Sequence, residues 1–240
     1  MRDTTGKRAA ARVMTPLALV LGLAGCAVTG DPPISLEERF YQVAFYDEDF
    51  DVEQSLIKRS SDIRLLVEGG TEADREKIND ILGQISEVTG LAVVDAESWA
   101  DANTVVKFLS DEEWEDFEEA DKTQVRSGGI WALGYYVKCA IDLLRTADPD
   151  PVAIIRIPDR LSGIERERCI AQEVGHSTGL LYDTDHLTDT VFSGLQGATY
   201  ITSVDKLLLR IHADPRLKAI MTWEEARPIV QQIISELEAG

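Results

Sequence analysis

One segment constrains the fold more than any other: Cys169-Ile-Ala-Gln172-Glu173-Val-Gly-His176-Ser-Thr-Gly179-Leu-Leu-Tyr182-Asp183. Residues three and four positions apart share one face of a helix, so Gln172, Glu173 and His176 fall on the same side. We expect a helix over residues 164–181, and Gly179 is a residue type that commonly ends or bends one. A turn that redirects the chain is predicted to follow.

This spacing resembles the zinc-binding helix of the zincin peptidases, H-E-x-x-H, and its metzincin extension H-E-x-x-H-x-x-G-x-x-H. In that helix the histidines bind Zn²⁺ and the Glu acts as general base. The positions that match are Glu173, His176, Gly179 and the acidic Asp183. Gln172 and Tyr182 replace the other two ligands, and a neutral Gln is a poor ligand for zinc. The resemblance therefore implies the peptidase fold more firmly than peptidase activity.

Three residues are the candidates for a site: Glu173 as catalytic base, and His176 with Asp183 as metal ligands. Each has a structural alternative. Glu173 can be a buried ion-pair partner, for instance of Lys138. His176 can be a hydrogen-bonded core residue, and Asp183 can cap a turn.

Further polar residues lie beyond the motif. Asp185 and His186 can join an oxygen-rich site or belong to a solvated turn. Asp205 lies 29 residues after His176, where related enzymes place an acidic ligand, but a charge favoured by a helix N-terminus is the preferred interpretation. His212 has no partner by spacing and is expected to be structural.

The N-terminal region predicts export and lipidation. Four basic residues precede an apolar run, Val13–Leu23, which is too short to span a bilayer and ends in Leu23-Ala24-Gly25-Cys26. This ending resembles the bacterial lipobox, in which the cysteine is acylated and becomes the new N-terminus. We expect a signal peptide at 1–25, a lipid anchor at Cys26 and a tether over 26–33. An ordinary cleaved signal peptide is the alternative.

Localisation follows from the same region. Ala27 does not resemble an inner-membrane retention signal, so the periplasmic face of the outer membrane is favoured. The chain carries a net charge of −19, and the signal region holds four basic residues and one acidic residue, so the remainder carries −22. Such a charge argues against nucleic acid and anionic membrane surfaces as partners. The acidic runs Asp47–Glu53 and Asp111–Asp121 are interpreted as solvated faces.

With Cys26 acylated, Cys139 and Cys169 remain in an oxidising compartment. We predict a disulfide between them that joins a central strand to the start of the motif helix. Two free thiols are the alternative.

The remaining chain, 34–240, has the length of one domain. Apolar periodicity, capping residues and β-rich runs predict the elements. Helices are expected at 35–44, 71–89, 110–119, 164–181, 204–212 and 223–237, and strands at 63–67, 91–94, 104–109, within 130–144 and at 152–157. This order predicts an α+β zincin-like domain: a small mixed sheet packed against the motif helix, followed by C-terminal helices.

Several segments together carry a broader resemblance. They are Phe40–Phe45, Ile57–Arg59, the motif helix, Asp205–Leu217 and Met221–Ala226. Over roughly Leu36 to Leu237 the chain resembles a bacterial domain-of-unknown-function family, number 2927, found in secreted and lipid-anchored proteins. The resemblance brings no established activity. It implies Glu173, the Gly179-Leu180 turn and Asp183 as family positions.

Three functions are compatible with these patterns. The favoured one is a lipid-anchored envelope protein without zinc-peptidase activity that acts as a binding or scaffold module, with no cofactor. Its partner would be another envelope protein or a peptide. A second is a metal-dependent hydrolase of peptides or cell-wall stems, with Glu173 as base and zinc held by noncanonical ligands. A third is a relative in fold alone, whose motif helix is purely structural.

Overall fold

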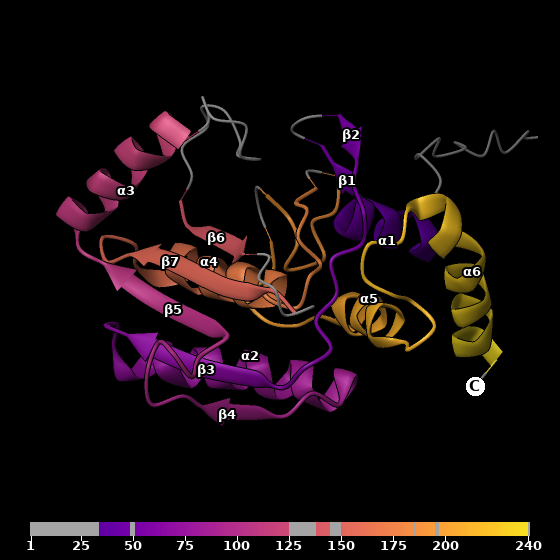
Figure 1. Ribbon diagram of the computed structural model, residues 1–240, viewed down its shortest axis with the longest axis horizontal. Helices are drawn as coiled ribbons and strands as arrows, with labels where there is room; N and C mark the ends of the chain where they lie inside the picture. The colour runs from indigo at the N-terminus through magenta and orange to yellow at the C-terminus, as the bar shows by residue number, and fades with distance from the viewer. Residues whose placement is uncertain are drawn as a thin grey trace, which may run out of the picture. The chain divides into compact units, whose positions relative to one another are not determined.

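A computed structural model provides the structure, which is described for the unit that begins at Ile34 (Figure 1). The described residues are 34–48, 51–124, 138–144, 150–184, 186–194 and 197–239, with 119–124 described by their backbone alone. The predicted signal peptide, Cys26 and the tether lie outside them, as do Asp185 and most of the predicted 130–144 strand region. No helix among the described residues is long and apolar enough to cross a membrane.

Within the described residues, five strands form one mixed sheet in the order β4-β3-β5-β7-β6. Their bounds are β3 Ile63–Glu68, β4 Val93–Asp95, β5 Thr104–Leu109, β6 Ala140–Leu144 and β7 Val152–Pro158. Strands β4, β3, β5 and β7 run parallel, and β6 pairs antiparallel with β7 at one edge. Of the three inner strands β3, β5 and β7, β5 is almost continuously buried, as expected of a strand that is covered on both faces. The predicted mixed sheet is confirmed.

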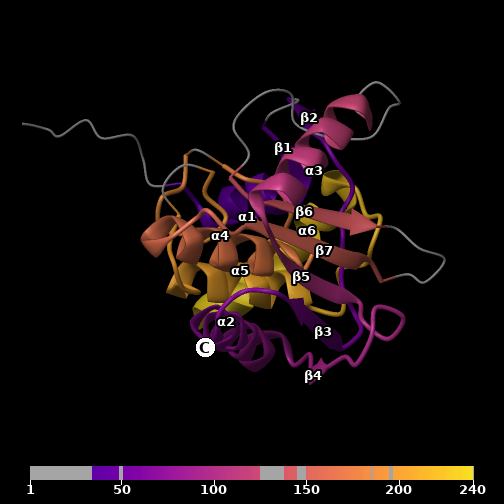
Figure 2. The ribbon, with the colours of Figure 1, turned by 90° about the vertical axis from the view of Figure 1, so that its left-hand side faces the viewer.

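Six helices accompany the sheet in the described part of the chain. They are α1 Leu36–Phe45, α2 Glu72–Thr89, α3 Asp111–Gln124, α4 Gly163–His176, α5 Ser203–Ala213 and α6 Trp223–Ala239. Helices α2 and α4 run side by side on one face of the sheet (Figures 1 and 2). Helix α5 contacts α2, α1 and α6. The α+β class is thus confirmed, with the motif helix α4 packed against β6 and β7 of the sheet and against α2 beside it.

Helix starts follow the predicted capping chemistry. The Ser35 hydroxyl accepts a hydrogen bond from the Glu38 amide at 3.1 Å. Thr71 and Asp74 form a reciprocal capping box at the start of α2, and Gly90, with φ +78°, caps its C-terminal end. These side chains satisfy amides that lack partners in the first turn, and Gly adopts the left-handed geometry at low cost.

Two elements differ from the prediction. The acidic run after α1, interpreted as a solvated face, contains a short hairpin of β1 (Tyr46–Asp47) and β2 (Val52–Glu53), in which Asp47 is buried. Helix α4 ends at His176, not at residue 181. The cause is local, because the hydroxyls of Ser177 and Thr178 each donate to the carbonyl three residues earlier, at 2.6 and 2.8 Å. They compete with continuation of the helix.

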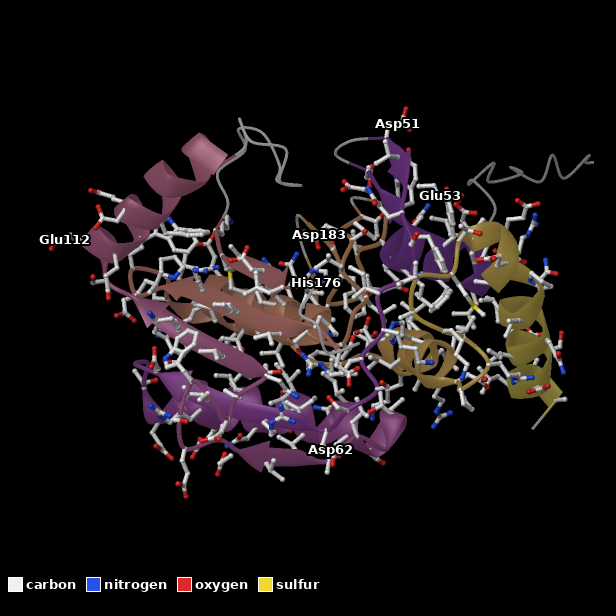
Figure 3. The ribbon with its side chains drawn as sticks, in the orientation of Figure 1. Asp51, Glu53, Asp62, Glu112, His176 and Asp183 are labelled. Carbon is white, nitrogen blue, oxygen red and sulfur yellow. A yellow bond between two sulfur atoms is a disulfide. The ribbon has the colours of Figure 1, made fainter. Side chains whose placement is uncertain are left out.

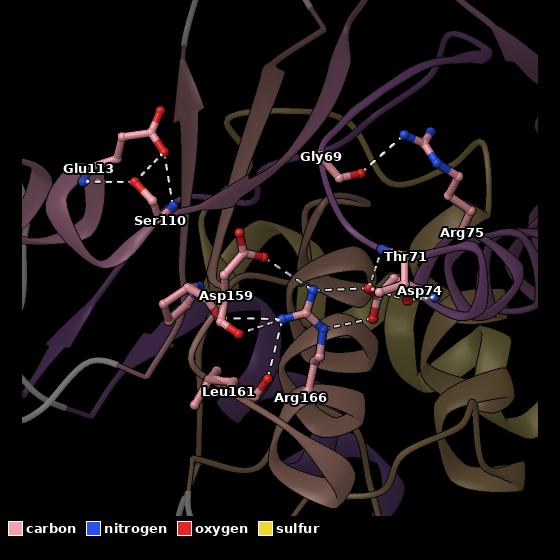
Figure 4. A network of polar contacts seen from close by, with 10 residues as sticks. Gly69, Thr71, Asp74, Arg75, Ser110, Glu113, Asp159, Leu161 and Arg166 are labelled. Carbon is pink, nitrogen blue, oxygen red and sulfur yellow. Dashed lines mark hydrogen bonds and ion pairs between the residues drawn. The ribbon is translucent and has the colours of Figure 1, made fainter.

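The start of α4 is clamped to α2 by a buried ion pair (Figure 4). The Arg166 guanidinium donates to both carboxylate oxygens of Asp74, with Nε–Oδ1 at 2.7 Å and Nη2–Oδ2 at 2.9 Å. Burial favours the neutral carboxyl, but these bonds and those from Thr71 outweigh it and lower the pKa of Asp74 to about 2. Bidentate pairing fixes both position and orientation of the helix.

The predicted disulfide is present between Cys139 and Cys169. Cys139 directly precedes β6, which is an edge strand rather than a central one, and Cys169 lies in the middle of α4 rather than at its start. The pairing was predicted, but both of these placements were wrong. The bridge ties the antiparallel edge of the sheet to the motif helix.

Candidate functional site

The motif residues converge on one oxygen atom. Gln172 and His176 lie one turn apart on α4, and both direct their Nε2 atoms toward Asp183. The Gln172 amide donates to Asp183 Oδ1 at 2.7 Å, and His176 Nε2 lies 2.9 Å from the same oxygen. Figure 3 shows His176 and Asp183 facing one another. The two helix positions that would point at a metal in a zincin therefore point at a carboxylate here.

His176 is held as a cation by its two neighbours. Its side chain is 3% exposed, and Nδ1 lies 2.6 Å from the Leu180 carbonyl, which can only accept a hydrogen bond. Nε2 faces the Asp183 carboxylate, so both ring nitrogens have acceptors. Burial by itself would lower the pKa of His176, but Asp183 outweighs that effect and the pKa rises to about 9.

Glu173, the candidate general base, is 5% exposed. Burial raises the pKa of its carboxyl to about 7; the His176 cation lowers it and Asp183 raises it further. The ion pair with Lys138 is not formed, because Lys138 Nζ bonds to Glu165 Oε1 at 2.7 Å. No group in the described residues donates a hydrogen bond to the Glu173 carboxyl. Its carboxyl is thus divided between the two protonation states near neutral pH.

The turn after α4 brings Asp183 back to the helix. Gly179 has φ +109°, and a Cβ there would lie 2.5 Å from the Ile57 carbonyl oxygen. The Tyr182 amide then donates to the Val43 carbonyl of α1 at 3.1 Å. Gly179 therefore permits a close approach of two backbones, and this approach sets where Asp183 lies.

Asp205, His186 and His212 lie apart from this cluster. Asp205 is fully buried and accepts hydrogen bonds from the Thr190 hydroxyl and from the amides of Val191 and Thr202. This is the structural role preferred for it from the sequence, extended by a tie to the 190–191 segment.

His186 pairs with Glu48 at 3.2 Å on the surface, where its side chain is 65% exposed. His212 is buried, and its Nε2 donates to the Ile57 carbonyl at 2.8 Å. Burial lowers the pKa of His212 to about 4, so the ring is neutral. The described residues hold no group of three or more His, Cys, Asp or Glu side chains placed to bind a metal ion.

The shared acceptor role of Asp183 was missed from the sequence. Asp183 was expected as a metal ligand or a turn cap, whereas it accepts from both Gln172 and His176. A usable signal existed in Gln172, because a side-chain amide donates hydrogen bonds well and ligates zinc poorly. A Gln at a ligand position therefore predicts an oxygen acceptor on the segment that follows the turn at Gly179.

The chain has three histidines, of which His176 and His212 are buried. We expect these two to titrate far apart, His176 near pH 9 and His212 near pH 4. The raised pKa of His176 stabilises the fold fully below its unfolded value of about 6.5, and this contribution is lost as pH rises toward 9. The lowered pKa of His212 contributes above about 6.5 and is lost as pH falls toward 4.

Imidazole resonances followed by NMR across this range measure both values. Asp183→Asn should lower the pKa of His176 and leave that of His212 unchanged, because only His176 contacts Asp183. A native His176 that titrates near its unperturbed value would contradict the ion pair.

Comparison with known families places these observations in context. Residues 34–232 match the family described as "Protein of unknown function (DUF2927)". A comparison with curated proteins gave no match. The family match spans α1 to most of α6 and includes Gln172, Glu173, His176 and Asp183. The chain therefore belongs to the DUF2927 family.

Proposed function

We propose that this protein is a zincin-like domain without a catalytic metal, anchored in the cell envelope through lipid at Cys26, which serves as a binding module. The observation that carries the proposal is the convergence of Gln172 Nε2 and His176 Nε2 on Asp183 Oδ1, at 2.7 and 2.9 Å. The order of elements supports the zincin-like part: β3, α2, β4 and β5, then β7 followed directly by the motif helix and two C-terminal helices.

The residues present do not fit a catalytic zinc ion. Such a site requires about three protein ligands and an open position for water. Gln172 brings no charge, and the phenol of Tyr182 has an unperturbed pKa of about 10. His176, with a pKa of about 9, is protonated at neutral pH and offers no lone pair, so a metal would have to displace a proton and break the pair with Asp183.

A second candidate function is a metal-dependent hydrolase of peptides or cell-wall stems. The observation that favours it is Glu173, a buried carboxyl whose pKa of about 7 suits a general base near neutral pH. His176 and Asp183 would be ligands in that case. The pairing of these two side chains with each other weighs against this candidate.

Zinc titration separates the two functions. The wild type should take up no stoichiometric zinc, whereas Gln172→His with Tyr182→His should bind about 100-fold more tightly than the wild type, because the ligand triplet is restored. The matched control is Gln232→His with Tyr200→His, which adds the same residue types at exposed positions.

Two results would count against the proposal, the first against the absence of a catalytic metal and the second against the zincin-like geometry. Stoichiometric zinc in the wild type, with peptide hydrolysis abolished by Glu173→Gln, would establish the hydrolase. Equal zinc affinity in the restored and control variants would mean that residues 172, 176 and 182 are not placed to bind one zinc ion. The resemblance to zincins would then be confined to the sequence of the helix.

We expect Cys26 to carry the lipid anchor, because Leu23-Ala24-Gly25-Cys26 follows a basic region and a short apolar run. The intact mass of membrane-extracted protein should show cleavage before Cys26 and attached acyl chains, which together give stable anchoring. Cys26→Ser should abolish both changes. A mature N-terminus at any other residue would contradict the anchor.

A further inference from the structure

A groove of about 640 Å³ lies away from the motif helix, between the β1–β2 hairpin and the first turns of α6. Its volume is in the range of sites that hold small ligands or a few residues of a peptide. The lining residues are Glu53, Trp223, Glu224, Arg227, Pro228 and Gln231. None of them belongs to α4 or to the turn that carries Asp183.

One wall of the groove is aromatic. The Trp223 indole packs against Tyr41 and Phe45, with ring centroids 5.1 and 5.2 Å apart. Tyr41 in turn stacks on Tyr46 at 5.7 Å. Trp223 is half-buried, so part of its ring is open to the groove while its packing holds it in place. A fixed indole face of this kind attracts cations.

Two carboxylates stand beside this wall. Glu53 and Glu224 are exposed, and within the described residues neither carboxylate accepts a hydrogen bond or forms an ion pair. Figure 3 shows Glu53 and Asp51 on the hairpin; Asp51 does not line the groove, and its carboxylate accepts a hydrogen bond from the Tyr46 hydroxyl at 2.5 Å. The negative potential reaches the wall, because burial raises the pKa of the Tyr41 phenol and the charges of Glu53, Glu38 and Asp51 raise it further.

The cation in the lining is already neutralised. Arg227 Nε bonds to Glu37 at 2.7 Å, and the Gln231 amide donates to both oxygens of the same carboxylate. These bonds hold Arg227 against α1. No cationic side chain among the lining residues is therefore left to pair with the carboxylates of Glu53 and Glu224.

We propose that the groove is a docking site for a basic peptide segment, which places an Arg or Lys side chain against Trp223 between Glu53 and Glu224. The chemistry is complementary on both counts, because a guanidinium or ammonium group stacks on an indole and pairs with carboxylates. The net charge of −19 draws such a partner toward the protein. This docking site goes beyond the function proposed above, since it depends on no residue of the motif helix.

Binding of acetyl-tetraarginine amide to the full-length protein tests this site by calorimetry. The matched ligand is acetyl-tetracitrulline amide, which keeps the shape of each side chain and removes its charge. The arginine peptide should bind at least about tenfold more tightly, because the neutral peptide loses both the indole and carboxylate interactions. Equal binding of the two peptides, or no binding of the arginine peptide, would overturn the proposal.

Two pairs of substitutions separate the groove from the general acidity of the chain. Glu53→Gln with Glu224→Gln should weaken the arginine peptide about tenfold, whereas Glu87→Gln with Glu238→Gln should change it less than about twofold. Both pairs remove two exposed carboxylates, so the net charge is the same. Trp223→Phe should weaken binding about threefold, because Phe attracts a cation less than Trp does. Equal losses in the two glutamate pairs would assign the binding to overall charge and overturn the site.

Discussion

We expect Gly179→Ala to lower the free energy of unfolding by about 3 kcal/mol or more. The backbone at Gly179 has φ +109°, a conformation that residues with a Cβ rarely adopt. The added Cβ would also lie 2.5 Å from the carbonyl oxygen of Ile57 and 3.3 Å from Cε1 of the buried His212 ring. Neither neighbour can yield easily, because the Ile57 carbonyl accepts the hydrogen bond from His212.

Gly83→Ala is the matched control. Gly83 lies in the interior of α2, and a Cβ there would meet nothing within 4 Å. Alanine reduces the freedom of the unfolded chain and favours a helix, so this variant should be more stable by about 0.5–1 kcal/mol. Urea unfolding measures both changes. A Gly179→Ala protein as stable as the wild type would show that the turn can relax, and the placement of Asp183 would then not depend on it.

Local signals explain why the sequence predicted most elements. Ser35, Thr71 and Gly90 each act within one turn of a helix, so their residue types indicate helix ends directly. The apolar pattern predicts too long a motif helix, because Leu180 and Leu181 continue it beyond His176. Hydroxyl side chains at Ser177 and Thr178 end it earlier, and periodicity does not weigh such competing hydrogen bonds.

The site was predicted in part for a different reason. The spacing of the motif identified Glu173, His176 and Asp183, which the structure brings together at one end of α4. It did not reveal that His176 and Asp183 bind each other. The spacing of a motif gives the positions of candidate ligands, but it does not show whether their side chains bind a metal ion or one another. Whether Glu173 acts as a base stays a prediction.

Contacts between distant segments were the least predictable. Ile57–Arg59 attracted notice through family resemblance alone, yet each of the three residues bonds to a remote part of the chain. Lys58 Nζ donates to the carbonyls of Asp214 and Leu217, which follow α5. Burial lowers the pKa of Lys58 to about 8, although the nearby Asp214 charge acts to raise it. Bonds from side chain to remote backbone leave no periodic trace in a sequence.

We expect Arg59→Met to lower the free energy of unfolding by about 3 kcal/mol. Arg59 is 3% exposed and joins three elements through backbone carbonyls. Nε donates to Ser177 at the end of α4 at 3.0 Å. Nη2 donates to Asn103 before β5 and to Pro151 before β7, at 3.2 and 3.1 Å. Methionine retains an apolar stem of similar length and leaves three buried oxygens without these donors.

The expected loss is smaller than the sum of three unsatisfied carbonyls, each of which costs about 1–3 kcal/mol. Burial lowers the pKa of the Arg59 guanidinium to about 10, and removing that buried charge offsets part of the loss. Arg210→Met, at an exposed position of α5, is the control and should change stability by less than about 0.5 kcal/mol. Urea unfolding of both variants measures the difference. If Arg59→Met were as stable as Arg210→Met, the hydrogen bonds of the guanidinium would only offset the free-energy cost of burying its charge. The end of α4 would then be held in place by the turn at Gly179 instead.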